Sequence, residues 1–117
     1  MKKIKIVIPI YNDWEGFIKI VSKIESLHQE TELDIEIIAV NDCSTISLNE
    51  AINSKLLKIT LINLAKNSGN QKAISIGLNY INEKYNDKEF DYVILSHVLE
   101  HVPNLIEFVQ FCYPRAF

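Results

Sequence analysis

The chain has 117 residues, of which 48 % are hydrophobic and 23 % are charged, and its formal net charge is −3. This length and composition are typical of one soluble globular domain with a buried core, and the chain is too short for two such domains. The weakly negative charge provides no general basic surface, which argues against a protein that binds nucleic acid or an anionic membrane.

Cysteine usage and hydropathy bear on where the chain works. Cys43 and Cys112 are far apart and do not have the spacing of a metal site. One disulfide between them is conceivable, but two free thiols in a cytoplasmic protein fit the pattern better. The apolar run behind the basic amino terminus ends at Pro9 without the cleavage site of a signal peptide. No uncharged stretch reaches the roughly 20 residues of a transmembrane helix. We therefore expect a cytoplasmic protein with no membrane-spanning segment.

Strands and helices alternate along the chain. The sequence pattern predicts strands at about residues 4–8, 33–40, 58–64 and 90–95, and helices at about residues 13–29, 47–54, 71–85 and from 96 onward. Pro9 ends the first strand because proline has no N–H to donate, and Asp13 can cap the helix that follows. This alternation predicts an α/β fold with a mostly parallel sheet and right-handed crossovers.

Two of the predicted helices carry an apolar stripe that identifies their buried side. The stripe of the first consists of Phe17, Val21, Ile24 and Leu27, and that of the second of Ala73, Ile74, Gly77, Leu78 and Ile81. A glycine inside a helix costs up to about 1 kcal/mol relative to alanine. We therefore expect Gly77 to permit close packing of its helix on the sheet.

Polar loops follow the first three predicted strands, at residues 11–13, 41–44 and 67–72. The carboxyl ends of parallel strands meet at one edge of a sheet, so these loops can form one pocket. Asp42 would be a carboxylate at a strand tip with backbone donors around it, able to accept a base N–H or a ribose hydroxyl. Gly69, the following helix start and Lys72 resemble a cradle for a diphosphate.

Three segments of the chain together form a sequence pattern: residues 7–12 (VIPIYN), residues 36–45 (EIIAVNDCST) and residues 67–73 (NSGNQKA) together with Gly77. This pattern resembles family 2 glycosyltransferases of the GT-A fold, and among them the polyprenyl-phosphate sugar transferases. The order and spacing of the segments match the amino-terminal, Rossmann-like half of that fold over about residues 3–95. The resemblance implies a nucleotide-diphosphate-sugar donor of the UDP or GDP type.

The same resemblance implies which residues bind the nucleotide. Pro9, Tyr11 and Asn12 would lie along the nucleoside, and Asp42 would contact the base or ribose. Asn67, Gly69 and Lys72 would lie near the ribose or the phosphates. Where the family usually has Asp-Asp after the second strand, this chain has Asn41-Asp42.

The chain departs from the family after the fourth strand. The family carries an Asp-x-Asp motif there, whose carboxylates hold Mg²⁺ or Mn²⁺ against the diphosphate. This sequence has Ser96-His97-Val98 instead, and the acceptor half with its catalytic base is missing. We therefore expect no bound metal in this chain, no assignable catalytic residue and no turnover by the chain alone.

Residues 90–104 resemble instead the segment after the fourth strand of class I S-adenosylmethionine-dependent methyltransferases, although the glycine-rich cofactor loop of that family is absent. Residues 97–101 also match the His-x-x-Glu-His zinc motif, without a convincing third ligand. We expect residues 1–95 to form the nucleotide-sugar-binding region. Residues 96–117 would be a divergent helical segment that indicates a truncated or fused reading frame.

Three functions thus remain open from the sequence. The first is a glycosyltransferase-like domain whose relatives transfer a sugar to a lipid-phosphate or glycan acceptor. The second is a non-catalytic α/β module that forms homo-oligomers through the apolar residues of its carboxy-terminal segment, which are Leu105, Ile106, Phe108, Val109 and Phe111. The third is a methyltransferase-like fragment.

Overall fold

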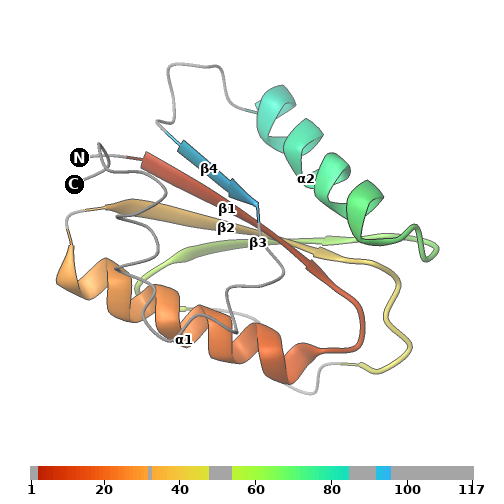
Figure 1. The fold of residues 1–117 in the computed structure, drawn as a ribbon, viewed down its shortest axis with the longest axis horizontal. Helices are drawn as coiled ribbons and strands as arrows, with labels where there is room; N and C mark the ends of the chain where they lie inside the picture. The colour runs from red at the N-terminus through yellow and green to blue at the C-terminus, as the bar shows by residue number, and fades with distance from the viewer. Residues whose placement is uncertain (1–2, 32, 48–53, 85–91, 96–117) are drawn as a thin grey trace.

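The computed structural model describes residues 3–31, 33–47, 54–84 and 92–95, and it forms an α/β fold (Figure 1). The elements in chain order are β1 (Lys3–Ile10), α1 (Trp14–Glu30), β2 (Asp34–Asn41), β3 (Lys58–Asn63), α2 (Asn70–Lys84) and β4 (Tyr92–Leu95). The predicted strands and helices are confirmed for these residues, and each boundary lies within two residues of its expected place. The prediction that Pro9 ends the first strand is wrong, because Pro9 and Ile10 still pair with Val40 and Asn41 of β2.

All paired strands of the sheet run parallel, in the order β3-β2-β1-β4. β1 and β2 are central strands, and every residue from Ile4 to Ile10 of β1 is buried. β3 is an edge strand, and none of its side chains is fully buried. The sheet thus explains why β1 and β2 are nearly continuous apolar runs whereas β3 mixes apolar and polar residues.

The two helices cover opposite faces of the sheet (Figure 1). Alternate residues of β1 serve the two faces, because side chains of a strand point to opposite sides in turn. Ile4, Ile6 and Ile8 pack with the buried stripe of α1, and Val7 packs with Ala73 of α2. The sheet is therefore the middle layer of three.

Gly77 lies directly against the sheet. A Cβ atom added there would come within 2.5 Å of Val7 Cγ1 and 3.3 Å of Val40 Cγ2, which is closer than packed carbon atoms approach. The expectation that Gly77 permits close packing is confirmed. The predicted stripe of α2 was too wide, however, because Leu78 is 36 % exposed. α2 contacts the sheet through the narrower line of Ala73, Gly77 and Ile81.

Several predictions fall outside the described residues. They are the greater part of the short helix at 47–54, Phe90 and Asp91 of the fourth strand, and the whole of the segment 96–117 with its zinc-like motif, Cys112 and the proposed oligomerisation residues.

Candidate functional site

The carboxyl ends of β1, β2 and β3 lie side by side. The strand register aligns Ile10 with Asn41, and Asn41 with Asn63. The Asn41 amide donates through Nδ2 to Asn63 Oδ1 at 2.9 Å, and the Leu64 N–H donates to the Asn41 carbonyl at 2.9 Å. The Asp42 N–H donates to the Ile10 carbonyl at 2.8 Å. The predicted meeting of the three polar loops at one sheet edge is confirmed.

Asn12 joins the loop after β1 to the loop after β2. Its Oδ1 accepts hydrogen bonds from the N–H of Thr45 at 2.8 Å, the N–H of Ile46 at 2.9 Å and the hydroxyl of Thr45 at 3.3 Å. Its own N–H donates to Ser44 Oγ at 2.9 Å. The residue has φ 63°, in the left-handed region that asparagine adopts more readily than most residues. Its side-chain oxygen is thus directed at protein backbone.

Asp42 joins the loop after β2 to the loop before α2. It is 1 % exposed, and its Oδ1 accepts the Ser68 N–H at 2.7 Å while its Oδ2 accepts the Gly69 N–H at 2.8 Å. Asn67 Nδ2 donates to the Asp42 carbonyl at 3.2 Å. Hydrogen bonds to an ionised acceptor are about twice as strong as neutral ones, so this carboxylate fixes the loop 67–69.

The predicted anion cradle therefore already holds an anion of the protein itself. The N–H groups of Ser68 and Gly69 point at the Asp42 carboxylate, and the φ of 88° at Gly69 permits this arrangement. The sequence could not reveal this because Asp42 and Gly69 are 27 positions apart. What remains for a ligand is the first turn of α2, whose backbone N–H groups have no acceptor within the helix.

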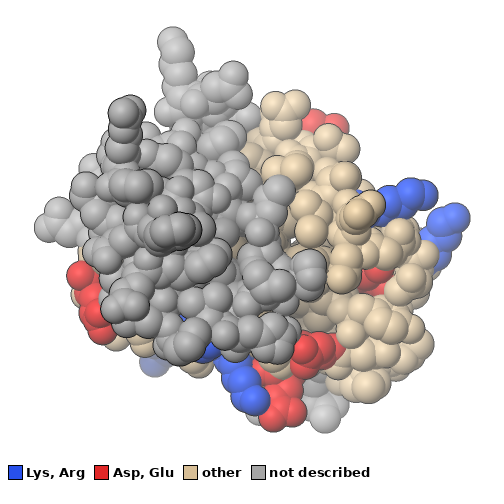
Figure 2. Space-filling view, viewed as in Figure 1, with Lys and Arg blue, Asp and Glu red and all other residues tan. Residues whose placement is uncertain are grey.

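Lys72 stands in that first turn and is exposed. In the space-filling view, basic side chains gather at the side of the molecule where Figure 1 places the connection between β3 and α2 (Figure 2). Lys66 and Lys72 are the basic residues of this part of the sequence, and both are exposed. A positive charge beside a helix amino terminus favours the approach of an anion.

A cavity of about 300 Å³ opens on the α1 side of this edge. Its described lining residues are Ile8, Pro9, Ile10, Tyr11, Asp13, Phe17, Ile20 and Asn70. The floor is apolar, whereas Tyr11, which is 47 % exposed, and the polar side chains of Asp13 and Asn70 supply hydrogen-bonding groups. This size and this mixture are typical of a site for a small organic ligand.

The structure brings only two of the predicted binding residues, Pro9 and Tyr11, into the lining of this cavity. It adds Asp13 and Asn70, which the sequence places in the polar loops 11–13 and 67–72 but which the family resemblance does not assign to the nucleotide. Asp13 also caps α1 as predicted, because its Oδ1 accepts the Gly16 N–H at 2.9 Å. Asn70 is the first residue of α2, and only the packing of that helix against β1 places it here.

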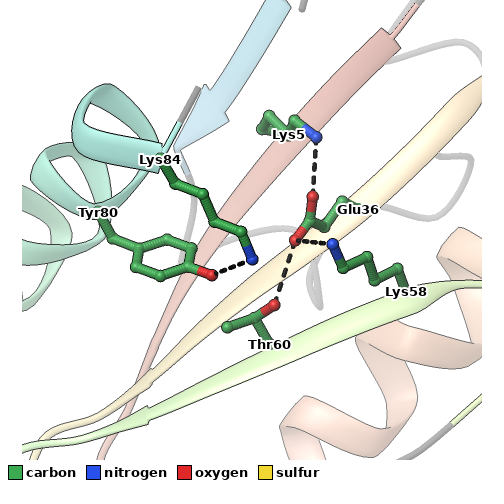
Figure 3. Close-up of polar contacts among 6 residues, drawn as sticks. All are labelled: Lys5, Glu36, Lys58, Thr60, Tyr80 and Lys84. Atoms are coloured by element: carbon green, nitrogen blue, oxygen red, sulfur yellow. Dashed lines mark hydrogen bonds and ion pairs between the residues drawn. The ribbon is translucent and has the colours of Figure 1, made fainter. Parts of the chain in front are cut away.

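A second polar cluster lies on the α2 face of the sheet and was also missed (Figure 3). Glu36 is 4 % exposed; its Oε1 lies 2.7 Å from Lys5 Nζ, and its Oε2 accepts from Thr60 Oγ1 at 3.1 Å and lies 3.7 Å from Lys58 Nζ. The three strands align Lys5, Glu36 and Lys58 in one register row. This row lies five residues before the row that ends the strands, so the cluster is separate from the cavity.

Metal ligands and thiols are sparse in the part of the chain that the structure describes. Within it, no group of three His, Cys, Asp or Glu side chains could hold a metal ion. Cys43 is a free thiol, and its Sγ lies 3.6 Å from the Ala65 carbonyl. Among the same residues, no helix has the length and apolar character needed to cross a bilayer.

A parallel sheet with a helix on each face, and a mixed apolar and polar cavity at its carboxyl edge, is typical of a Rossmann-like α/β domain. The sequence model of the family "Glycosyl transferase family 2" matches residues 5–95. The chain therefore belongs to glycosyl transferase family 2, and the resemblance noted in its sequence is confirmed. No curated protein sequence and no solved structure gives a significant match.

Family membership supports a glycosyltransferase-like function in general and, with it, the binding of a nucleotide-sugar donor. The described architecture is that of a GT-A, Rossmann-like half domain.

Proposed function

We propose that the chain binds a nucleotide-diphosphate sugar of the UDP or GDP type at the carboxyl edge of its sheet. The cavity beside Tyr11 carries this proposal, since it is the described space at that edge with both an apolar floor and polar walls. The nucleoside would lie against Pro9 and Tyr11. The diphosphate would lie toward Lys72 and the first turn of α2.

In this proposal Asp42 supports the site by holding the loop 67–69 in place. Each carboxylate oxygen accepts one backbone N–H and the residue is 1 % exposed, so Asp42 would act through the loop that it holds and not through contact with the nucleoside. Asn67 and Gly69 belong to the same fixed loop, and they bring the start of α2 to the edge.

The proposal concerns binding and assigns no metal-dependent step. The family would hold Mg²⁺ or Mn²⁺ after the fourth strand, and this sequence has Ser96-His97-Val98 at that place. Those residues lie outside the described ones. Without a carboxylate pair in these positions, we propose that the chain holds its donor without transferring the sugar to a lipid-phosphate or glycan acceptor. Polysaccharide assembly is the proposed setting, and the cytoplasm the proposed compartment.

The direct test is isothermal titration of the chain with UDP and GDP, and then with the corresponding nucleotide sugars. We expect millimolar or tighter binding of one nucleotide. Tyr11→Ala should weaken it about tenfold, because base–aromatic contacts contribute roughly 1–3 kcal/mol. Tyr80→Ala, at a tyrosine of α2 outside the cavity lining, is the matched control and should leave the affinity unchanged.

Failure of both nucleotides to bind would refute the proposal, and so would equal affinities of the two tyrosine variants and the unmodified chain. S-adenosylmethionine belongs in the same titration, because saturable binding that UDP does not displace would favour the methyltransferase-like alternative. Sedimentation tests the oligomerising module, whose proposed contact residues are not among those described.

A further inference from the structure

We propose that Asn12 is a positioning residue, which holds Tyr11 and Asp13 as the wall of the cavity and does not itself contact the ligand. This inference rests on the proposed nucleotide site and changes the part that Asn12 plays in it. It starts from the direction of the Asn12 side chain, whose oxygen faces the loop after β2.

The three groups bonded to Asn12 Oδ1 are all donors: the N–H of Thr45, the N–H of Ile46 and the hydroxyl of Thr45. With the bond from its own N–H to Ser44 Oγ, residue 12 makes four hydrogen bonds to residues 44–46. These partners are 32 to 34 positions away in the sequence. The contact therefore fixes one loop against another and is more than a local turn.

Trp14 repeats the connection two residues later. Its indole Nε1–H donates to the Ile46 carbonyl at 2.7 Å, and the residue is 8 % exposed. Residues 12 and 14 are thus held by the neighbouring loop, whereas residues 11 and 13 line the cavity. This alternation gives Asn12 a specific role, because Tyr11 and Asp13 stay directed toward the cavity while Asn12 is bonded to residues 45 and 46.

We call the four hydrogen bonds between Asn12 and residues 44–46 the Asn12 clamp. Because the backbone at Asn12 is left-handed, the effect of losing this clamp can be separated from the effect of changing the backbone conformation. Glycine adopts φ 63° without strain but lacks the acceptor oxygen, and aspartate tolerates this φ and retains an acceptor for all three donors. Aspartate lacks the amide NH₂, which is the group that a directly contacting Asn12 would offer to a base or ribose acceptor. If Asn12 acts as a clamp, Asn12→Gly should weaken nucleotide binding and Asn12→Asp should not. If Asn12 contacts the ligand directly, both variants should weaken binding to a similar extent.

The experiment compares Asn12→Gly, Asn12→Asp and Leu27→Ala with the unmodified chain. Leu27 is 1 % exposed in the core near the end of α1, so its truncation lowers stability without touching the loops. Three quantities are measured at a temperature where every variant is folded: the Kd for UDP and GDP, hydrogen exchange at the amides of Thr45 and Ile46, and the NMR signals of the Tyr11 ring.

We expect Asn12→Gly to speed exchange at Thr45 and Ile46, to shift the Tyr11 signals and to weaken nucleotide binding about tenfold. Asn12→Asp should stay within about twofold of the unmodified affinity. Leu27→Ala, whose lower unfolding midpoint is recorded in a separate thermal melt, should leave the Kd unchanged. Loss of affinity in Asn12→Asp as large as that in Asn12→Gly would overturn the proposal in favour of a direct contact.

The two proposals fail in different ways. If the unmodified chain binds neither nucleotide, the proposed function is wrong. The positioning role of Asn12 is then tested by hydrogen exchange at Thr45 and Ile46 and by the NMR signals of the Tyr11 ring alone. If nucleotide binds but Asn12→Gly leaves both the Tyr11 signals and the Kd unchanged, the positioning role is wrong and the nucleotide site stands.

Discussion

At the scale of single residues, the two buried carboxylates of the described chain are paired with backbone N–H groups or with polar and positively charged side chains. Asp42 is 1 % exposed and faces two N–H groups, and Glu36 is 4 % exposed and faces Lys5, Thr60 and Lys58. Removing the partners of a buried charge costs several kcal/mol, so the loss of either set of partners should destabilise the fold. Asp42 stabilises the loop 67–69 at the carboxyl edge of the sheet, whereas Glu36 stabilises the row of aligned residues that it forms with Lys5 and Lys58.

Replacing Asp42 tests the first of these roles. Asp42→Ala leaves the Ser68 and Gly69 N–H groups without their acceptor, and we expect the free energy of unfolding to fall by about 2–4 kcal/mol, since bonds to charged groups contribute about 1.5–3 kcal/mol each and are not fully additive. Urea denaturation measures this loss. Asp34→Ala, at an exposed aspartate of β2, is the control and should change stability by less than about 0.5 kcal/mol.

Asp42→Ala should also weaken nucleotide binding, because the loop before α2 loses its attachment. Equal affinity in the variant would show that neither the loop 67–69 nor Asp42 contributes to the site.

The Glu36 cluster predicts a non-additive pair. Glu36→Leu removes the carboxylate that lies 2.7 Å from the Lys5 ammonium, in a residue 8 % exposed, and should cost about 3–5 kcal/mol. Adding Lys5→Leu also removes the other charge of this ion pair, so the double variant should recover at least about 1 kcal/mol of that loss. Thermal and urea unfolding of the single and double variants measure the coupling. Additive losses would contradict the idea that the broken Lys5–Glu36 ion pair is the source of the cost.

At the scale of elements, α2 is held to the sheet by a narrow contact. Ala73, Gly77 and Ile81 are its buried residues, Leu78 is exposed, and the helix approaches β1 closely at Gly77. α1 instead buries seven residues along its length. The difference follows from side-chain size, since small residues let a helix approach a sheet while large ones fill the space between them.

Gly77→Ala should therefore be destabilising even though alanine is the better helix former. The added methyl group would meet Val7 Cγ1 at 2.5 Å, and overpacking of this kind costs about 1–3 kcal/mol, against a gain in helix propensity of about 1 kcal/mol. Asn79→Ala, on the exposed side of the same helix, isolates the propensity term and should be neutral or stabilising. Thermal melts followed by circular dichroism compare the unfolding midpoints of the two variants. Equal midpoint changes would mean that β1 shifts to make room for the methyl group without an energetic cost.

At the scale of the whole molecule, the net charge of −3 opposes the approach of an anionic ligand, so attraction must be local. The basic side of the molecule seen in Figure 2 lies where β3 connects to α2, beside the helix start. A diphosphate would therefore depend on one small region of a protein that is negative overall.

This arrangement predicts that substitution of Lys72 changes the affinity for a nucleoside diphosphate but not the affinity for the uncharged nucleoside. Lys72→Ala should weaken UDP or GDP binding about three- to tenfold and reduce its salt dependence, because an exposed charge contact is worth up to about 1 kcal/mol and is screened by salt. Binding of the uncharged nucleoside should not change. Lys55→Ala, at an exposed lysine before β3, is the control. Parallel titrations at low and high salt measure both effects, and an equal loss for the nucleoside would place Lys72 away from the phosphates.

The order of the described elements, the buried stripe of α1 and the three polar loops at the sheet edge can all be predicted from the sequence alone. These follow from local periodicity and from the rule that parallel strands end on one side. The sequence also identified the family that residues 5–95 match. Pro9 and Tyr11 were chosen as binding residues from that resemblance, and they line the cavity, although their contact with a nucleotide stays a prediction.

The hydrogen-bond partners of the polar side chains, in contrast, follow from the tertiary structure. The partners of Asn12 are more than thirty positions away, those of Asp42 are at least 25 away, and Lys5 and Glu36 are separated by 31. Such pairs depend on strand register and on the path of each loop, and local residue patterns carry no information on either. For this reason Asn12 and Asp42 were expected to face a ligand, whereas in the folded chain their oxygens bind the backbone that shapes the site.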